Sequence, residues 1–188
     1  MAERSPIVVL PAGYTLRQGS TLDRALLVKF MHRTYLDIAG QADDVSRLPP
    51  HPPEALSRTV DHYLSADTPI WWVECDRDSS PAGLPSRSAS LRPVAGVWVG
   101  SAIDQASGDR QAYIFLLYVA PEHRRRGIGT ALMRQVEIWA AARGDRQIGL
   151  QVFHANQPAL QLYQQLGYHV HALSLVKRLP PDRGEFSL

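Results

Sequence analysis

The sequence predicts an α/β fold of the α+β type, in which a mixed, mostly antiparallel central sheet carries helices on both faces. Three observations support this prediction. Residues 94–119 contain two alternating apolar stretches joined by a turn-forming segment. Residues 127–143 have the apolar spacing of an amphipathic helix. Another alternating stretch follows at 147–153, and a short helical pattern comes directly after it.

The first 75 residues predict two strands and two helices. In chain order these are a strand at 14–17, a helix that begins at the capping-type segment 20–23, a polar loop at 40–53, a helix at about 53–64 and a strand at 70–75. The first helix is expected to bury an apolar stripe formed by Leu22, Leu26, Phe30 and Met31. The second helix is expected to bury Leu56, Val60 and either Tyr63 or Leu64.

The second half predicts a connection followed by strands and helices in alternation. Residues 76–93, rich in Ser and Pro, are expected to form a mobile connection and not a domain boundary. The elements after it are strands at 94–103 and 111–119 joined by a hairpin-like turn at 104–109, a helix at 127–143, a strand at 147–153, a helix from Asn156 and a tail strand at 168–178. The 127–143 helix is expected to bury Ile128, Leu132, Val136 and Trp139 or Ala140, and to stop at Gly144.

Bulk properties exclude several classes of protein. At 188 residues the chain suits one domain with a substantial core, so we expect a single domain over residues 1–188. The formal net charge of +2 gives no reason to expect a nucleic acid or membrane partner. No apolar run approaches the roughly 18 residues of a membrane span, and no signal peptide is apparent. The single cysteine, Cys75, excludes an internal disulfide, which fits a cytoplasmic location.

The most informative segment runs from Leu117 to Thr130 and combines a strand end, three arginines, two glycines and a helix start. This order presents several backbone N–H groups and the positive end of a helix dipole to one point in space. Arginine guanidinium groups beside that point supply donors that match phosphate oxygens. A P-loop is excluded because no Lys follows Gly129, and a dinucleotide fingerprint because Leu132 stands where a third small residue is needed. The segment therefore predicts a site for another phosphate-bearing ligand.

Two motifs carry a resemblance to a known family. Arg124-x-x-Gly127-x-Gly129 resembles the acetyl-CoA pyrophosphate loop of the GNAT superfamily of N-acetyltransferases. The later segment Asn156-x-x-Ala159-x-x-Leu162-Tyr163-x-x-x-Gly167-Tyr168 is similar to a second element of the same family. In it, Asn156 suits a helix N-cap, Pro158 is tolerated in the first turn, and Gly167 suits the left-handed position that ends a helix. The resemblance is specific over 117–168 and looser over 94–179.

The resemblance implies where the cofactor lies. In the family, the strand before the loop and the strand after the helix splay apart, and CoA enters the gap. On this sequence, the main chain of Leu117, Tyr118 and Val119 would pair with the pantetheine arm. The pyrophosphate would be received by Arg124, Arg125, Arg126, Gly127, Ile128, Gly129 and Thr130, where a Cβ at either glycine would block close approach. Asn156 would contact the cofactor arm, or serve only as a helix cap. About 94–179 would then form the acetyl-CoA-binding core, and about 14–75 the acceptor side.

The implied activity is transfer of the acetyl group from acetyl-CoA to a primary amine by direct attack, without a metal. Tyr163 is the expected general acid, since a phenol with a pKa near ~10 can protonate a thiolate whose acid has a pKa near ~8.5. The alternative is that Tyr163 is only a core aromatic residue. A ping-pong mechanism through Cys75 is disfavoured, because Cys75 lies outside both motifs.

The general base is left open. Many family members place a Glu on the strand before the loop, but residues 111–119 contain no carboxylate. The candidates are a water chain or one of Glu74, Asp104, Glu122, His123 and His154, of which His154 would be tested first. The tryptophans at 71, 72 and 98 either line an acceptor pocket or belong to the core.

The acceptor and the oligomeric state also stay open. The region 21–66, which shapes the acceptor side in the family, matches no known pattern, so protein N-termini, lysine side chains, polyamines, amino acids and aminoglycosides all remain candidates. The protein could be a monomer or a homodimer. A non-catalytic acyl-CoA-binding sensor is the alternative function. A nucleic-acid-binding module built on Arg124–Arg126 is remote, because three arginines make too short a patch.

Overall fold

The fold is built on one mixed sheet. The computed structural model describes residues 8–40, 53–75, 92–104 and 107–177. Five strands lie in the order β1-β2-β3-β4-β5. They are β1 (Tyr14–Gln18), β2 (Ile70–Cys75), β3 (Arg92–Ile103), β4 (Arg110–Val119) and β5 (Ile148–Leu150). The first four pair antiparallel, whereas β5 runs parallel to β4. The mixed, mostly antiparallel sheet predicted from the sequence is confirmed.

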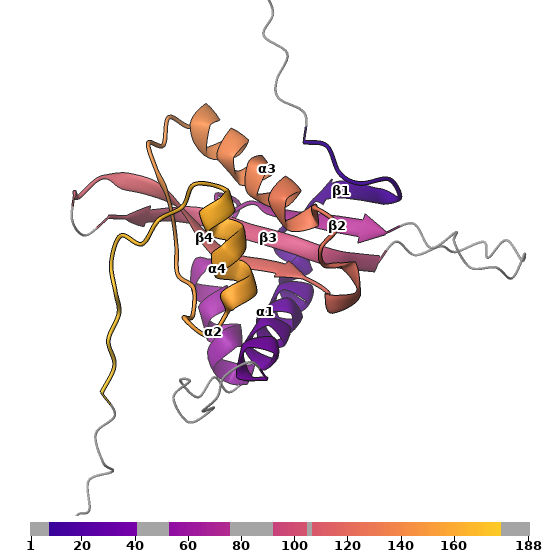
Figure 1. Cartoon of the computed structure of the whole chain (residues 1–188), viewed down its shortest axis with the longest axis horizontal. Coiled ribbons are helices and arrows are strands. Elements are labelled where there is room, and N and C mark those ends of the chain that lie inside the picture. Colours follow the sequence, from indigo (N-terminus) through magenta and orange to yellow (C-terminus); the bar gives the residue numbers. More distant parts are fainter. Residues whose placement is uncertain (1–7, 41–52, 76–91, 105–106, 178–188) are drawn as a thin grey trace, which may run out of the picture.

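Helices cover both faces of this sheet, as predicted (Figure 1). The helices are α1 (Arg24–Ala39), α2 (Pro53–Tyr63), α3 (Ile128–Ala142) and α4 (Gln157–Gln165). One core lies between the sheet and α3, where Leu132 and Val136 are fully buried against Val97. The other lies between the sheet and the α1–α2 pair, where Leu27 and Val60 are fully buried. Helix α4 packs against the α3-side core.

The start of α1 confirms the predicted cap and corrects the predicted stripe. The Ser20 hydroxyl accepts from the Leu22 N–H at 3.2 Å, and the Asp23 carboxylate accepts from the Ser20 N–H at 2.9 Å, which completes a capping box. A 3₁₀ turn, Thr21–Asp23, precedes α1. Because a 3₁₀ turn holds three residues, it puts Leu22 out of phase with the helix. Leu22 is 93% exposed, and the buried residues of α1 are Leu27, Phe30 and Ile38.

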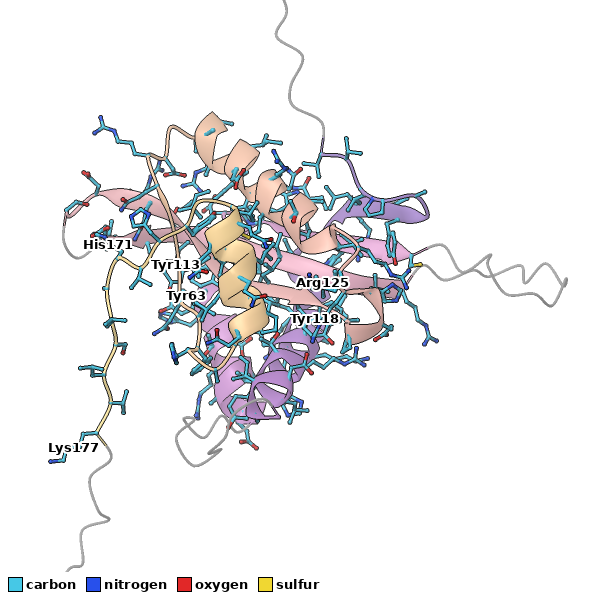
Figure 2. All side chains as sticks on the ribbon, viewed as in Figure 1. Tyr63, Tyr113, Tyr118, Arg125, His171 and Lys177 are labelled. Atoms are coloured by element: carbon cyan, nitrogen blue, oxygen red, sulfur yellow. The ribbon has the colours of Figure 1, made fainter. Side chains whose placement is uncertain are left out.

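The predicted tail strand at 168–178 is wrong over the described residues. No strand is present from Tyr168 to Lys177, and the apolar side chains that suggested one lie 68% exposed or more. They are Val170, Leu173, Leu175 and Val176. Figure 2 shows this segment passing His171, whose Nε2 lies 3.7 Å from the Asp104 carboxylate beside the end of β3, and then leading away from the helices and the sheet to Lys177. An alternating pattern makes a strand only where a neighbouring strand accepts its hydrogen bonds, and β5, the last strand of the sheet, is three residues long.

One further predicted element is shorter in the structure, and two predicted connections lie largely outside the described residues. The predicted strand at 147–153 is shorter, Ile148–Leu150, because the chain leaves the sheet after Leu150. The predicted loop at 40–53 and connection at 76–93 lie largely outside the described residues, although Arg92 and Pro93 already belong to β3. Across the described segments, no helix combines the length and apolar character needed to cross a bilayer.

Candidate functional site

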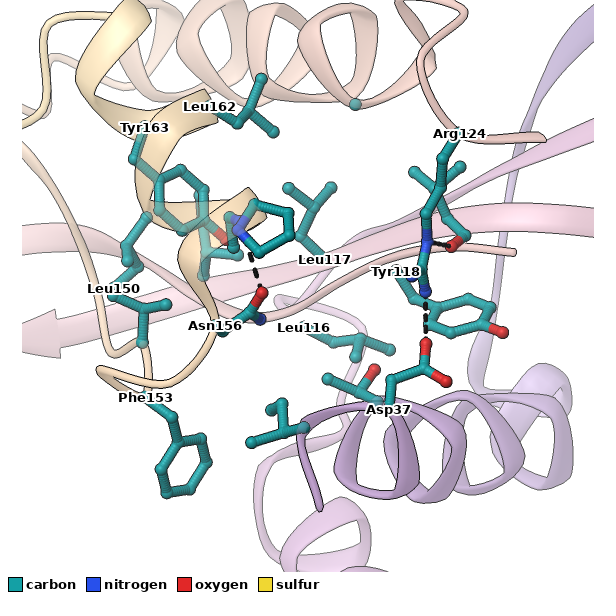
Figure 3. Close-up of a pocket in the computed structure, with 18 of the residues that line it drawn as sticks. Asp37, Leu116, Leu117, Tyr118, Arg124, Leu150, Phe153, Asn156, Leu162 and Tyr163 are labelled. Carbon is teal, nitrogen blue, oxygen red and sulfur yellow. Dashed lines mark hydrogen bonds and ion pairs between the residues drawn. The ribbon is translucent and has the colours of Figure 1, made fainter. Parts of the chain in front are cut away.

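A cavity opens where β4 and β5 separate. β5 pairs with β4 only along Ala112–Ile114, whereas β4 stays paired with β3 as far as Val119. The last residues of β4 therefore have one edge without a strand partner in the described structure. A cavity of about 670 Å³ lies along this edge, between α4 and the α1–α2 pair (Figure 3). Every residue from Tyr113 to Val119 lines it.

A β-bulge in β4 shapes this cavity. Ile114 pairs with Val99 and Leu116 pairs with Trp98, so Phe115 is one extra residue on β4. Before the bulge, Ile114 belongs to the α3-side core, whereas after it Leu116 belongs to the core under α1 and α2. The bulge thus changes which residues of β4 face each layer at the point where β5 ends.

The loop after β4 presents unpaired backbone donors to the cavity. Gly127 is the N-cap of α3 with φ +84°, and no described side chain caps this end. The first helical bond runs from the Ala131 N–H to the Gly127 carbonyl at 3.0 Å. The N–H groups of Ile128, Gly129 and Thr130 precede that bond, so they have no partner within the helix. All three residues line the cavity, which makes this end of α3 suited to an anion.

The two glycines of the loop have different physical roles. Gly127 needs its left-handed backbone, which a residue with a Cβ adopts only with strain, and a Cβ there would meet open space. At Gly129 a Cβ would lie 3.1 Å from Leu162 of α4, so this glycine permits close packing of α3 and α4. The sequence-based expectation that a Cβ at either position blocks a ligand is therefore too simple for Gly129. Arg125 also has a positive φ, +60°, so the loop is strained at a position that lines the cavity.

The three arginines of the loop point in different directions. Arg124 donates from Nε to the Val119 carbonyl at 2.8 Å and is ion-paired through Nη2 with Asp37 of α1. Arg126 donates to the Tyr14 hydroxyl at 3.0 Å and to the Glu122 carbonyl at 3.1 Å.

The consequence for an anion differs from one arginine to the next. Arg124 and Arg125 line the cavity, whereas Arg126 is not among its lining residues. Arg125 is exposed (Figure 2), and the ion pair of Arg124 connects the loop to α1.

Helix α4 brings the second motif to the same cavity. Asn156 is the N-cap, as predicted, and its side chain accepts from the Ala159 N–H at 3.3 Å. Gly167, with φ +87°, follows the C-cap residue Leu166, which confirms the predicted helix end. Asn156 and Tyr163 both line the cavity (Figure 3). Burial raises the pKa of the Tyr163 phenol to about 12, so the phenol stays protonated throughout the physiological range.

Of the five candidate bases, His123 alone lines the cavity. Its Nδ1 lies 2.8 Å from the Tyr14 hydroxyl. Glu74 is buried and paired with Arg17 at 2.6 Å, and Asp104 is buried within 2.6 Å of the Gln147 amide. Glu122 and His154 are exposed and stand outside the lining, so His154 is no longer the first candidate.

Several lining residues were not foreseen from the sequence. They come from α1, α2, β4 and the segment after β5, and include Tyr35, Asp37, Ile38, Thr59, Phe115 and Phe153. Met31, Leu56 and Ile128, which also line the cavity, belonged to predicted apolar stripes. Trp72 and Trp98 are fully buried and Trp71 is 7% exposed, so the tryptophans belong to the core. Among the described residues, no three potential metal ligands lie together.

The sheet splits beside the N-terminus of α3, and the cavity lies in the split. The model of the acetyltransferase (GNAT) family matches residues 41–168, more than half of the chain. The chain therefore belongs to the GNAT family and is an acyl-CoA-dependent acetyltransferase.

Solved structures share this fold. A Pyrococcus furiosus protein assigned as an acetyl transferase is similar over 88% of this chain and 99% of its own, with TM-score 0.64 and 24% identity. A Clostridium acetobutylicum protein assigned as an acetyltransferase, whose structure includes acetyl-CoA, is similar over 87% and 96%, with TM-score 0.61 and 18% identity. An aminoglycoside acetyltransferase from an uncultured soil metagenomic sample is similar over 89% and 99%, with TM-score 0.54 and 22% identity. At these identities the likeness concerns the fold.

Proposed function

We propose that this protein is an N-acetyltransferase that moves the acetyl group of acetyl-CoA to a primary amine, with Tyr163 as the proton donor. The observation that carries the proposal is one cavity that joins the unpaired N–H groups of α3 to the protonated Tyr163 phenol. An anion site alone would be enough for a protein that binds acyl-CoA without transferring the acyl group. A protonated donor buried in the same cavity adds what departure of a thiolate requires.

Backbone and side-chain groups around the cavity would bind the pyrophosphate and the pantetheine arm of acetyl-CoA. The N–H groups of Ile128, Gly129 and Thr130, with Arg125, would hold the pyrophosphate. The free edge of β4 at Leu117 and Tyr118 would pair with the pantetheine arm. The Val119 carbonyl already accepts from Arg124, so pairing there would require that bond to be exchanged. Asn156 would serve mainly as the helix cap, because its side-chain oxygen already accepts from Ala159.

The raised pKa of Tyr163 refines its role. Moving a proton from a phenol of pKa about 12 to a thiolate whose acid has pKa about 8.5 is uphill by roughly 5 kcal/mol if the thiolate is solvated as in water. A thiolate that forms in the same buried cavity also has a raised pKa, which reduces this gap. Tyr163 therefore acts first as a hydrogen-bond donor to the departing sulfur, and its proton transfers as the C–S bond breaks.

The described cavity offers no obvious base for the amine. Asp37, the one described carboxylate in the lining, is ion-paired with Arg124, and the His123 ring contacts Tyr14. We infer that the acceptor loses its proton to water and reaches the site as the neutral amine. The single cysteine, Cys75, is not among the lining residues, so direct attack fits better than a ping-pong route. The cysteine content also fits a cytoplasmic enzyme.

The test is CoA thiol release from acetyl-CoA across a panel of amines, with acetyl-CoA affinity measured in parallel. Release that depends on the acceptor supports the proposal. Tight acetyl-CoA binding with no acceptor-dependent release would instead favour the non-catalytic acyl-CoA sensor. Absence of acetyl-CoA binding in a folded protein would refute both functions.

A further inference from the structure

Apolar and aromatic side chains form one wall of the cavity, which we call the acceptor wall. Tyr35 and Ile38 of α1, Leu56 of α2, Phe115 of β4 and Phe153 after β5 line it. The Phe115 ring is itself held by aromatic neighbours, with ring centroids 4.7 Å away at Trp98 and 5.0 Å away at Tyr63. A wall supported in this way suits an apolar body on the acceptor.

The charges of the lining, over the residues that the structure describes, do not suit a polycation. The described lining holds one carboxylate, Asp37, and this carboxylate is ion-paired with Arg124. Arg125 adds a further positive charge. A polyamine or an aminoglycoside carries several ammonium groups and needs anionic partners to offset their desolvation. A single amine makes no such demand.

The fraction of the acceptor that is present as neutral amine narrows the class of acceptor further. In the described lining, the carboxylate and the imidazole that could serve as a base, Asp37 and His123, are engaged with Arg124 and Tyr14. At pH 7.5 roughly one alkylamine in a thousand is neutral, because its pKa is about 10.4, whereas roughly a quarter of α-amines with pKa about 8 are neutral. Because both candidate bases of the described lining are engaged, this lining favours the α-amine, although the greater intrinsic nucleophilicity of the more basic amine offsets part of that advantage.

We propose that the acceptor is the α-amine of an amino-acid residue with an apolar or aromatic side chain. This inference rests on the proposed function. The neutral α-nitrogen forms a bond to the acetyl carbon while the C–S bond breaks. The nitrogen loses a proton to water, the sulfur gains one from Tyr163, and Tyr163 regains a proton from water. The products are the N-acetylated residue and CoA thiol.

The experiment compares kcat/KM at pH 7.5 for matched acceptors. Phenylalaninamide and 2-phenylethylamine share a phenethyl body and differ in amine pKa, whereas glycinamide keeps the α-amine and lacks the body. Spermidine and kanamycin represent polycations. We expect phenylalaninamide to exceed each of the other four by at least tenfold. Free phenylalanine and a peptide that begins with Phe, assayed beside it, distinguish a small-molecule source of the α-amine from a polypeptide source.

The pH profile and one variant add independent tests. For 2-phenylethylamine, kcat/KM should rise about tenfold per pH unit from pH 7 to pH 9, whereas the phenylalaninamide value should level off near pH 8. Phe153 is exposed, so Phe153→Ser should leave the protein folded. This variant should lower the ratio of kcat/KM for phenylalaninamide to kcat/KM for glycinamide at least threefold.

Several results would overturn this acceptor class. Equal rates for phenylalaninamide and 2-phenylethylamine at pH 7.5, or an unchanged ratio in the folded Phe153 variant, contradict it. Preferred acetylation of spermidine or kanamycin would also overturn it while leaving the N-acetyltransferase function intact. Acetyl-CoA binding without acetylation of any amine would contradict both the acceptor class and the N-acetyltransferase function.

Discussion

Replacing Tyr163 with Phe removes one hydroxyl group from the cavity and so tests the role of that group alone. The ring fills the same space in the variant, so acetyl-CoA affinity and the fold should be retained. A hydrogen bond to a charged group contributes about 1.5–3 kcal/mol, and its loss at the departing sulfur should lower kcat roughly 10- to 150-fold. The assay is steady-state thiol release, with the Kd of acetyl-CoA measured by calorimetry.

Tyr168→Phe is the matched control for this variant. Its ring centroid lies 5.9 Å from that of Tyr163, its hydroxyl is buried with no hydrogen-bond partner among the described residues, and it is not a lining residue. Removing this hydroxyl should leave kcat unchanged and should not reduce stability, because no hydrogen bond is lost. Similar kcat values for Tyr163→Phe and the wild type would contradict the proton-donor role.

The pH profile gives a second check on the same residue. The donor is active while protonated, and with a pKa of about 12 the Tyr163 phenol should cause no loss of kcat below about pH 11. A decline with an apparent pKa near 10 that disappears in Tyr163→Phe would show that the phenol is not buried as the structure describes.

Three further predictions address stability, the loop and its ion pair. The Tyr163 pKa is raised from 10.0 to about 12 in the folded state, so its contribution to stability is complete below pH 10 and is lost as the pH rises to 12. Burial also raises the pKa of Tyr168, so the prediction concerns a difference: between these pH values the wild type should lose up to about 2.7 kcal/mol more stability to denaturant unfolding than Tyr163→Phe does; equal pH dependence in the two proteins would refute this. Gly127→Glu should abolish CoA binding, whereas Gly144→Glu, at an open position with a similar φ of +75°, should retain it at a similar cost in Tm; equal affinities would reject the loop assignment. Arg124→Gln should weaken CoA binding by leaving the Asp37 carboxylate near the phosphates, and adding Asp37→Asn should restore part of the affinity; additive effects in this double-mutant cycle would mean that the pair does not act on the ligand.

Local signals in the sequence predicted much of the fold. Ser20 and Asn156 cap helices in the structure because short polar side chains satisfy N–H groups close to them in the chain. Gly144 and Gly167 follow helix ends with positive φ because glycine tolerates the left-handed region. The amphipathic spacing of 127–143 likewise indicated which side of α3 is buried.

Features that depend on distant partners were not predicted. The tail residues at 168–177 alternate like a strand, but pairing requires a neighbour that the sequence does not specify. The role of Asp37 depends on Arg124, which is 87 residues away in the chain and reaches it only through the fold. The bulge at Phe115 was missed because burial still alternates along β4 while the faces exchange.

One part of the candidate site was predicted from the sequence, and another part was not. The loop residues Gly127 to Thr130 were predicted to border the ligand site because they form a contiguous motif, and they line the cavity. The acceptor wall was not predicted, because Tyr35, Leu56 and Phe153 come from separate elements and each resembles an ordinary apolar position. Contiguous sites can be recognised from sequence, whereas walls assembled across a fold require coordinates.

The bulge at Phe115 adds an aromatic side chain to the cavity without disturbing the sheet on either side of it. Because Ile114 pairs with Val99 and Leu116 pairs with Trp98, β3 alternates regularly across the point where β4 holds its extra residue. If Phe115 alone were deleted, Ile114 would still face the α3-side core and Leu116 the core under α1 and α2. The extra residue therefore serves the cavity, which Phe115 lines, and not the pairing of the strands. Relatives that lack it could keep the same sheet and differ only in the space that the cavity offers.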